Sequence, residues 1–190
     1  MSIADGPWTR PEPGFVCPEC GFAYDDCAPA ASAATVRALP PRYRVPMERS
    51  LPGEDLERLL RSRPAPGRWS ALEYACHVRD SFALYEARIR VTLAEDRPSF
   101  PRMNRDQRAV DQAYNRQDPS VVGDELAARA AALAAELEAV PADGWSRIGV
   151  REDLDMSVDW MARNVVHEGQ HHLLDIGRAL RAARRDGRTA

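Results

Sequence analysis

Residues 157–180 read SVDWMARNVVHEGQHHLLDIGRAL and carry the two signals that decide the fold. Apolar residues recur three and four positions apart, which predicts a helix capped by Ser157 and running to about Arg185. Within it, His167-Glu168-Gly169-Gln170-His171 has the HExxH spacing. Histidines four apart lie on one face of a helix, about 5–6 Å apart at Cβ, so both reach one cation. The stretch therefore predicts a metal site on a long helix.

The surrounding sequence does not extend this pattern to a zinc protease. In HExxHxxGxxH, the glycine position holds Leu174 here and the last histidine position holds Gly177. No glutamate follows Glu168 that could serve as a later ligand. A further histidine ligand must come from upstream, where His77 is the only histidine.

Other helix signals predict an all-α four-helix bundle. Ser70-Ala71-Leu72-Glu73 is a capping box, and Trp69 can staple against Tyr74 across the helix start. Four helices joined by connections of mixed length are typical of a bundle. Helices are expected at residues 53–61, 70–94, 118–141 and 157–185, with a short helix within 105–114 and a loop or short hairpin at 145–155.

Composition predicts one globular domain with an N-terminal arm. The 190 residues are 44% hydrophobic and 29% charged, which is ordinary for a folded domain. Residues 1–34 are an extended arm rich in Pro, Gly and Ala, and residues 35–190 form the bundle. A net charge of −3 argues against a nucleic-acid partner. We expect a cytoplasmic protein without a membrane partner, because the sequence has neither a signal peptide nor a membrane span.

Two predicted helices each carry a seam that mixes polar and apolar residues. Polar groups inside a bundle are costly unless they are paired or bind metal. Facing the seams brings His77 to His167 and His171, the predicted ligands of one divalent Zn, Ni, Fe or Mn ion. The alternative is that these histidines are hydrogen-bonded core or surface residues. His172 points to the apolar stripe and is expected to be structural or to support a metal ligand. The seams are Trp160, Asn164, His167, His171, Leu174, Arg178 and Tyr74, His77, Ser81, Leu84, Arg88, Val91.

The arm contains a second metal motif. Cys17-Pro18-Glu19-Cys20-Gly21 is half of a zinc knuckle, and a structural site needs four ligands. Cys27 is a candidate third ligand, and the fourth would come from Cys76, an acidic side chain or a second subunit. Because a reducing compartment disfavours disulfides, we expect a structural zinc that fastens the arm to the bundle, or else free thiols or a redox use.

Taken together, the motifs resemble the DinB-like metalloproteins. The matching residues are Trp69-Ser70 with Glu73, His77-Val78-Arg79-Asp80, and His167-x-x-x-His171-His172-Leu173-Leu174-Asp175-Ile176. The resemblance covers about residues 36–185 and implies an up-down-down-up bundle with a three-histidine site. For some members it also implies transfer of thiols such as mycothiol, bacillithiol or glutathione, and isomerisation of maleylpyruvate. The usual Asp-Gly of the loop after Trp145 is replaced by Glu152-Asp153-Leu154-Asp155, so we expect the pocket rim to differ from that of the family.

The predicted function is conjugation of a small thiol to an electrophilic small molecule. Three neutral imidazoles leave the cation its charge and open positions, which favours an enzyme over a closed structural site. All 26 basic residues are arginine, which suggests a GC-rich, actinobacterium-like genome and therefore mycothiol as the thiol. The alternatives are a metal-dependent hydrolase, or a stress or interaction protein that binds metal without turnover.

Further residues have expected roles around that site. Arg88 and Arg178 are expected to hold a substrate carboxylate, or else to be paired charges at the bundle end. Tyr74 and Asn164 are also expected to contact substrate, and Glu168 and Asp80 to handle protons. A solvated Glu168 is the alternative. The native metal, the thiol, the electrophile and the oligomeric state, a homodimer included, are not determined by the sequence.

Overall fold

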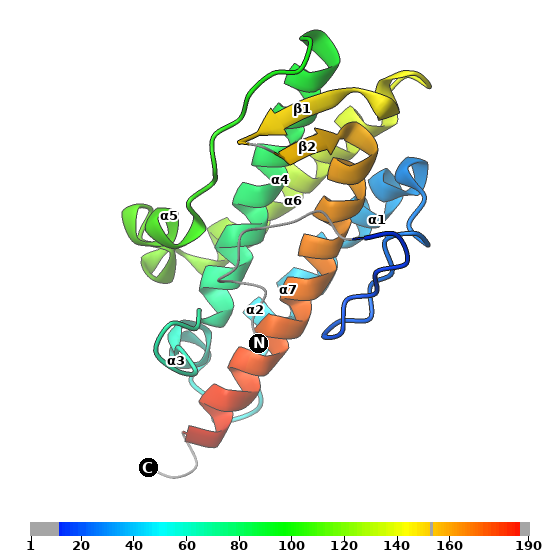
Figure 1. The fold of residues 1–190 in the computed structure, drawn as a ribbon. Helices are drawn as coiled ribbons and strands as arrows, with labels where there is room; N and C mark the ends of the chain where they lie inside the picture. The colour runs from blue at the N-terminus through cyan, green and yellow to red at the C-terminus, as the bar shows by residue number, and fades with distance from the viewer. Residues whose placement is uncertain (1–11, 153, 187–190) are drawn as a thin grey trace.

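A computed structural model describes residues 12–152 and 154–186. These residues form a four-helix bundle, as the sequence predicts (Figure 1). Within the described ranges, no helix is long and apolar enough to cross a membrane. The bundle helices are α1 (Ser32–Ala38) continued by α2 (Pro40–Glu48), α4 (Ala71–Ala94), α6 (Pro119–Glu138) and α7 (Val158–Asp186).

Shorter elements connect the bundle helices. The strands β1 and β2 pair antiparallel, with Ile148 opposite Ser157 and Arg151 opposite Leu154, so the region expected as a loop or hairpin is a hairpin. The short elements are η1 (Pro29–Ala31), α3 (Leu56–Arg61), α5 (Arg105–Asp111), η2 (Tyr114–Arg116), η3 (Gly144–Ser146), β1 (Ile148–Arg151) and β2 (Leu154–Ser157).

Side-chain pairs between helices fix the helix directions. Helices α4 and α6 run parallel, because the partners of successive α4 arginines also advance along α6. Helix α7 runs antiparallel to α4, and α1 with α2 runs antiparallel to α6, which gives an up-down-down-up bundle. The pairs are Arg79–Glu125 and Arg90–Glu136, His77–Glu168 and Tyr85–Asn164, and Arg37–Glu138 and Arg44–Asp124.

The start of α4 follows from its cap. The Ser70 hydroxyl accepts from the Glu73 amide at 3.2 Å, and the Glu73 carboxylate accepts from the Ser70 amide at 2.8 Å. The Trp69 and Tyr74 rings lie 5.5 Å apart across this start. Both the capping box and the staple are therefore confirmed. They fix the first turn of the helix that carries His77 one turn later.

The first bundle helix differs from the prediction. The segment expected as that helix is only the short α3, and residues 32–48 take its place in the bundle. Prolines in this segment argue against a helix. Pro40 nevertheless lies at the first position of α2, where proline is tolerated, directly after a break at Leu39. The buried face has helical spacing: Val36, Leu39, Tyr43 and Met47.

Helices α1 and α2 press closely against the middle of α7 at Gly169. The buried Tyr43 hydroxyl donates to the Gly169 carbonyl at 2.6 Å. A Cβ at Gly169 would lie 2.4 Å from Leu39 Cδ1, well inside van der Waals contact. A larger residue at this point of α7 would displace the buried Leu39 side chain, so the close contact favours glycine between the two histidines of the HExxH motif.

Candidate metal centres and the adjoining pocket

Helix α7 presents two rows of potential metal ligands on different faces. Successive residues of an α-helix are about 100° apart, so residues four apart share a face and adjacent residues do not. His167 and His171 face the N-terminal arm, whereas Glu168 and His172 face α4. One stretch of helix therefore serves two neighbouring groups.

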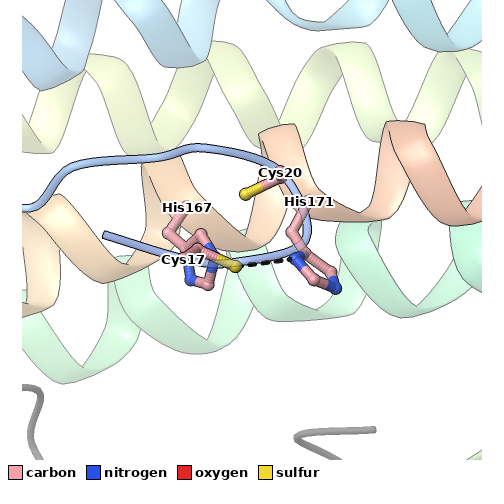
Figure 2. A group of neighbouring side chains, drawn as sticks. All are labelled: Cys17, Cys20, His167 and His171. Atoms are coloured by element: carbon pink, nitrogen blue, oxygen red, sulfur yellow. Dashed lines mark hydrogen bonds between the residues drawn. The ribbon is translucent and has the colours of Figure 1, made fainter. Parts of the chain in front are cut away.

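The first group joins the arm to α7. Cys17, Cys20, His167 and His171 place one ligand atom each within 4.8 Å of the others (Figure 2). The arm makes a tight turn, because the Cys17 amide donates to the Phe22 carbonyl and the Gly21 amide to the Cys17 carbonyl, both at 2.8 Å. Gly21 has φ +74°, a left-handed conformation that favours glycine. The knuckle geometry thus points both sulfurs at the helix.

Aromatic residues after the knuckle hold the arm on α7. The Phe22 ring stacks on His167 with centroids 5.2 Å apart. The Tyr24 hydroxyl donates to Asn164 Oδ1 at 2.8 Å and lies 2.9 Å from His167 Nδ1. Burial lowers the pKa of His167 to about 4, so its imidazole is neutral at physiological pH. Burial raises the pKa of the Cys20 thiol to about 11, so this sulfur needs a cation in order to ionise.

The second group lies between α4 and α7. Glu168 Oε2 is 3.3 Å from Nε2 of His77 and 3.3 Å from Nε2 of His172. Burial alone would raise the pKa of Glu168, but the two imidazoles outweigh it and hold the pKa well below its usual value. Asp175 Oδ2 lies 3.0 Å from His172 Nδ1 and fixes the orientation of that ring.

The structure divides the predicted metal ligands between these groups. His77 meets Glu168 and His172, while His167 and His171 meet the arm cysteines. His172, expected as a structural residue or a support for a ligand, faces His77 with ring centroids 5.0 Å apart. Cys27 lies against the Ser32 hydroxyl at 3.7 Å and is outside both groups. The sequence predicts that His167 and His171 lie beside His77. In the structure the residues of α7 that lie beside His77 are each one position later, Glu168 and His172.

A pocket of about 390 Å³ opens beside the second group. Its lining comes from α4, α5, β1 and α7 and includes His77 and Glu168. Four arginines contribute to the lining beside two carboxylates, Asp106 and Glu168, so the lining has a net positive charge that suits an anionic ligand. These arginines are Arg88, Arg102, Arg105 and Arg151. Arg102 is itself paired with Glu152.

Arg88 is the buried member of this set. It is 4% exposed, donates to the Pro101 carbonyl at 2.7 Å, and its Nε has no hydrogen-bond partner among the described residues. No carboxylate within the described ranges pairs with it, and burial lowers its pKa. The Phe100 ring lies 5.5 Å from its guanidinium carbon, which compensates only part of the charge. A buried arginine without a counterion is ready to receive an anion.

Tyr85 and Asn164 complete the polar wall. Asn164 Nδ2 donates to the Tyr85 hydroxyl, while its Oδ1 accepts from Tyr24. Burial raises the pKa of Tyr85 to about 12, so the hydroxyl stays protonated. Its proton has no acceptor among the described residues and is available to a ligand in the pocket. Asn164 therefore lies in the pocket wall.

The other predicted site residues lie elsewhere. Asp80 contacts Arg79, Arg108 and Tyr114 and does not line the pocket. Tyr74 stacks on His172 with centroids 5.3 Å apart, so it supports a metal group from outside the pocket. Arg178 is exposed and pairs with Glu19 of the knuckle. The pocket-lining residues that the sequence analysis did not single out include Tyr85, Arg102 and Arg105, which no spacing signal marks.

Comparison with known proteins identifies the family. The family model of the DinB superfamily matches residues 53–176. The chain belongs to the DinB superfamily. Its fold also matches YfiT from Bacillus subtilis, described as a probable metal-dependent hydrolase with an unusual four-helix bundle topology. That match has a TM-score of 0.72 and 17% identity, and covers 84% of this chain and 87% of YfiT. No curated protein matches the sequence.

A DinB-superfamily bundle implies a divalent metal, and the residues facing the pocket fit one. Two imidazoles and one carboxylate converge on a common point, and Asp175 orients one imidazole from behind. His77 and His172 are buried, and burial lowers the pKa of His77, which favours the neutral imidazole that metals bind. Burial also acts to lower the pKa of His172, but hydrogen bonds to Asp175 and Glu168 raise it to about 9, so a cation there must displace the second proton of that ring. The group differs from a three-histidine site because Glu168 replaces one imidazole.

Proposed function

We propose that the protein is a divalent-metal-dependent enzyme that acts on a small anionic substrate. The observation that carries the proposal is Arg88, a buried arginine without a carboxylate partner in the described chain, in the same pocket as His77 and Glu168. Leaving a buried charge unpaired is costly, and an anionic substrate group would remove that cost. The pocket volume of about 390 Å³ suits a small metabolite.

The proposed division of labour follows from the pocket walls. A cation held by His77, Glu168 and His172 would supply Lewis acidity at one end of the pocket. Arg88 would bind the anionic group of the substrate at the other end, through charge-assisted hydrogen bonds. Tyr85 would donate its hydroxyl proton to a substrate oxygen, oriented by Asn164.

Two nucleophiles are consistent with this arrangement. Water is favoured by the ligand set, because two histidines and one glutamate are the ligands of well-known zinc hydrolases. A small thiol is favoured by family resemblance, and four pocket arginines suit a thiol that carries carboxylates, such as glutathione. We propose water first, and thiol transfer, mycothiol and bacillithiol included, as the second candidate.

An assay with paired substrates tests the proposal. Metal-loaded protein is incubated with nitrophenyl esters that differ only in carrying a carboxylate or a neutral group. A parallel series combines each of the three thiols with monochlorobimane. We expect turnover of the anionic ester above background, and formation of a bimane conjugate if the thiol is the true nucleophile. Background rates in every arm, at full metal occupancy, would contradict an enzymatic function.

Variants at Arg88 test the substrate class. Arg88→Met should raise KM for the anionic substrate at least about tenfold with little change in kcat, since it removes a charge-assisted hydrogen bond. Arg88→Lys should restore part of the affinity, and Arg37→Met, at an exposed arginine paired with Glu138, should change nothing. An equal KM for wild type and Arg88→Met would refute the assigned role. The variant should fold, because replacing an unpaired buried charge with an apolar side chain is tolerated.

A further inference from the structure

We infer that Cys17, Cys20, His167 and His171 form a closed structural zinc site that fastens the N-terminal arm to α7. This site is separate from the metal group that faces the pocket, and the two share no ligand. All four donors converge on one point between the arm and the helix (Figure 2). Two come from the knuckle turn and two from one face of the helix, so the whole set lies within a single chain.

The spacing of the Cys17 sulfur and the His171 nitrogen matches a tetrahedral zinc site. With Zn–S of about 2.3 Å and Zn–N of about 2.0–2.1 Å, tetrahedral angles place sulfur and nitrogen about 3.6 Å apart. Cys17 Sγ lies 3.6 Å from His171 Nδ1. The remaining ligand-atom separations are all within 4.8 Å. The four ligand atoms therefore lie close enough together to share one ion.

The hydrogen bonds of His167 leave its metal-binding nitrogen free. Tyr24 gives its only hydroxyl proton to Asn164 Oδ1, which can only accept. The Tyr24 oxygen must then accept the proton of His167 Nδ1, 2.9 Å away. His167 Nε2 is consequently the unprotonated nitrogen, and it is buried without a partner among the described residues in a side chain only 7% exposed. A buried nitrogen lone pair without a donor requires an explanation, and a cation provides it.

His171 is oriented in the complementary manner. Its Nε2 lies 3.4 Å from Asp175 Oδ2, which favours a proton on that nitrogen. The unprotonated Nδ1 is then the atom turned toward Cys17. Each histidine ligand thus has an oxygen acceptor behind it, the arrangement that fixes the tautomer and raises ligand basicity in metal sites.

Charge balance favours zinc in this buried position. Binding converts the Cys17 and Cys20 thiols to thiolates and releases two protons to solvent, while the neutral imidazoles release none. Two thiolates then cancel the charge of one Zn²⁺, so the site is neutral. Neutrality matters because Cys17 is 1% exposed and an unbalanced charge there would be costly. Four protein ligands leave no open position, which indicates a structural role.

Metal content of full-length variants tests the inference. Zinc-saturated wild type should hold two zinc ions per chain. Cys17→Ser/Cys20→Ser should lose the zinc ion of the arm site and keep the ion that faces the pocket. His77→Ala/His172→Ala should also hold one zinc ion, because it loses the ion that faces the pocket and keeps the one at the arm site. Cys27→Ser is the matched control, since this thiol contacts Ser32 instead of the site, and should leave the count unchanged. An unchanged zinc content in the Cys17→Ser/Cys20→Ser variant would overturn the inference.

Cobalt substitution distinguishes the two sites without relying on stability. A cobalt ion bound by two thiolates gives sulfur-to-metal charge-transfer absorption, which a site of imidazoles and carboxylate cannot give. We expect this absorption in the wild type and in His77→Ala/His172→Ala, and its loss in the cysteine variant. His171→Asn keeps both thiolates and should instead weaken the binding of cobalt at this site. If a cysteine variant does not fold, chelation and refilling of wild type supplies the same readout. Cobalt-loaded wild type without the charge-transfer band would contradict thiolate ligation, whether or not the protein is an enzyme.

Discussion

His167 and Glu168 are adjacent in the sequence, yet their side chains belong to different candidate metal groups. His167 faces the knuckle cysteines, and Glu168 lies 3.3 Å from His77 on α4. The rotation of about 100° between neighbouring helix positions is sufficient to separate them. The HExxH motif therefore contributes to two groups of ligands in this protein: His167 and His171 face one group, and Glu168 faces the other.

The Tyr24 hydroxyl connects the arm site to the pocket wall. It accepts from His167 and donates to Asn164, whose amide in turn orients Tyr85 in the pocket. Tyr24→Phe should weaken zinc binding at the arm site about 10–100-fold, the usual effect of removing a group that orients a metal ligand. Zinc competition with a chromophoric chelator measures this change.

A second tyrosine provides the control for Tyr24. Tyr43→Phe also removes a buried hydrogen bond to α7, at the Gly169 carbonyl, but touches neither metal group. Its zinc affinity should equal that of wild type, although the free energy of unfolding should fall by about 1 kcal/mol. Equal zinc affinity in both variants would show that Tyr24 does not orient His167.

Substitution of Gly169 should destabilise the bundle. A methyl group there meets Leu39 Cδ1 at 2.4 Å and Phe82 Cζ at 3.4 Å, so Gly169→Ala overpacks the contact between α1, α2 and α7. We expect a loss of about 1–3 kcal/mol in the free energy of unfolding by urea, measured at saturating zinc. Gly177→Ala should act in the opposite direction.

The opposite sign at Gly177 has a simple cause. A Cβ at Gly177 meets only Arg181, at the end of a flexible side chain 3.3 Å away. Alanine there improves helix propensity by up to about 1 kcal/mol without a packing penalty. A destabilised Gly177→Ala, or a Gly169→Ala as stable as wild type, would contradict this account of how α1 and α2 pack on α7.

Asp80 should contribute stability that depends on pH. Burial acts to raise its pKa, but hydrogen bonds from Tyr114, Arg108 and Arg79 outweigh burial and lower it. A lowered folded-state pKa means that the contribution is fully present above the unfolded value, about 3.9. It is lost as pH falls through the folded-state pKa. Asp80→Asn should therefore cost about 2 kcal/mol at pH 7 and progressively less below about pH 4.

Urea unfolding of wild type and Asp80→Asn at a series of pH values checks this dependence. Asp124→Asn is the control, because that carboxylate is 70% exposed in its pair with Arg44 and contributes little. A difference between wild type and Asp80→Asn that is constant from pH 7 to pH 3 would show that the charge of Asp80 is not the stabilising feature.

The sequence predicts most of the bundle because the residues that start its helices lie within a few positions of one another in the sequence. Ser70 with Glu73, and Asp118 before Pro119, cap helices through contacts within one turn, and both caps are present. The sequence does not predict the first bundle helix, because prolines at positions 40, 41 and 46 usually argue against a helix. In the structure, burial of Tyr43 and Met47 overrides that preference.

The candidate site was predictable in its residue types and less so in its grouping. Two adjacent pairs, His167 with His171 and Glu168 with His172, have the same spacing, and no local signal tells which pair faces α4. The answer depends on the arm, whose Phe22 packs on His167 from a distance of more than one hundred residues along the chain. The sequence did contain one relevant signal. The cysteine knuckle lacks enough ligands for a structural zinc site, and α7 has more histidines than a single three-ligand site requires.

Anomalous diffraction at the zinc edge, from crystals of the zinc-loaded full-length protein, tests the division into two centres most directly. We predict two anomalous peaks in each chain. One should lie among Cys17, Cys20, His167 and His171, and the other among His77, Glu168 and His172. A single peak ligated jointly by His77, His167 and His171, with the cysteine sulfurs turned away, would contradict the account.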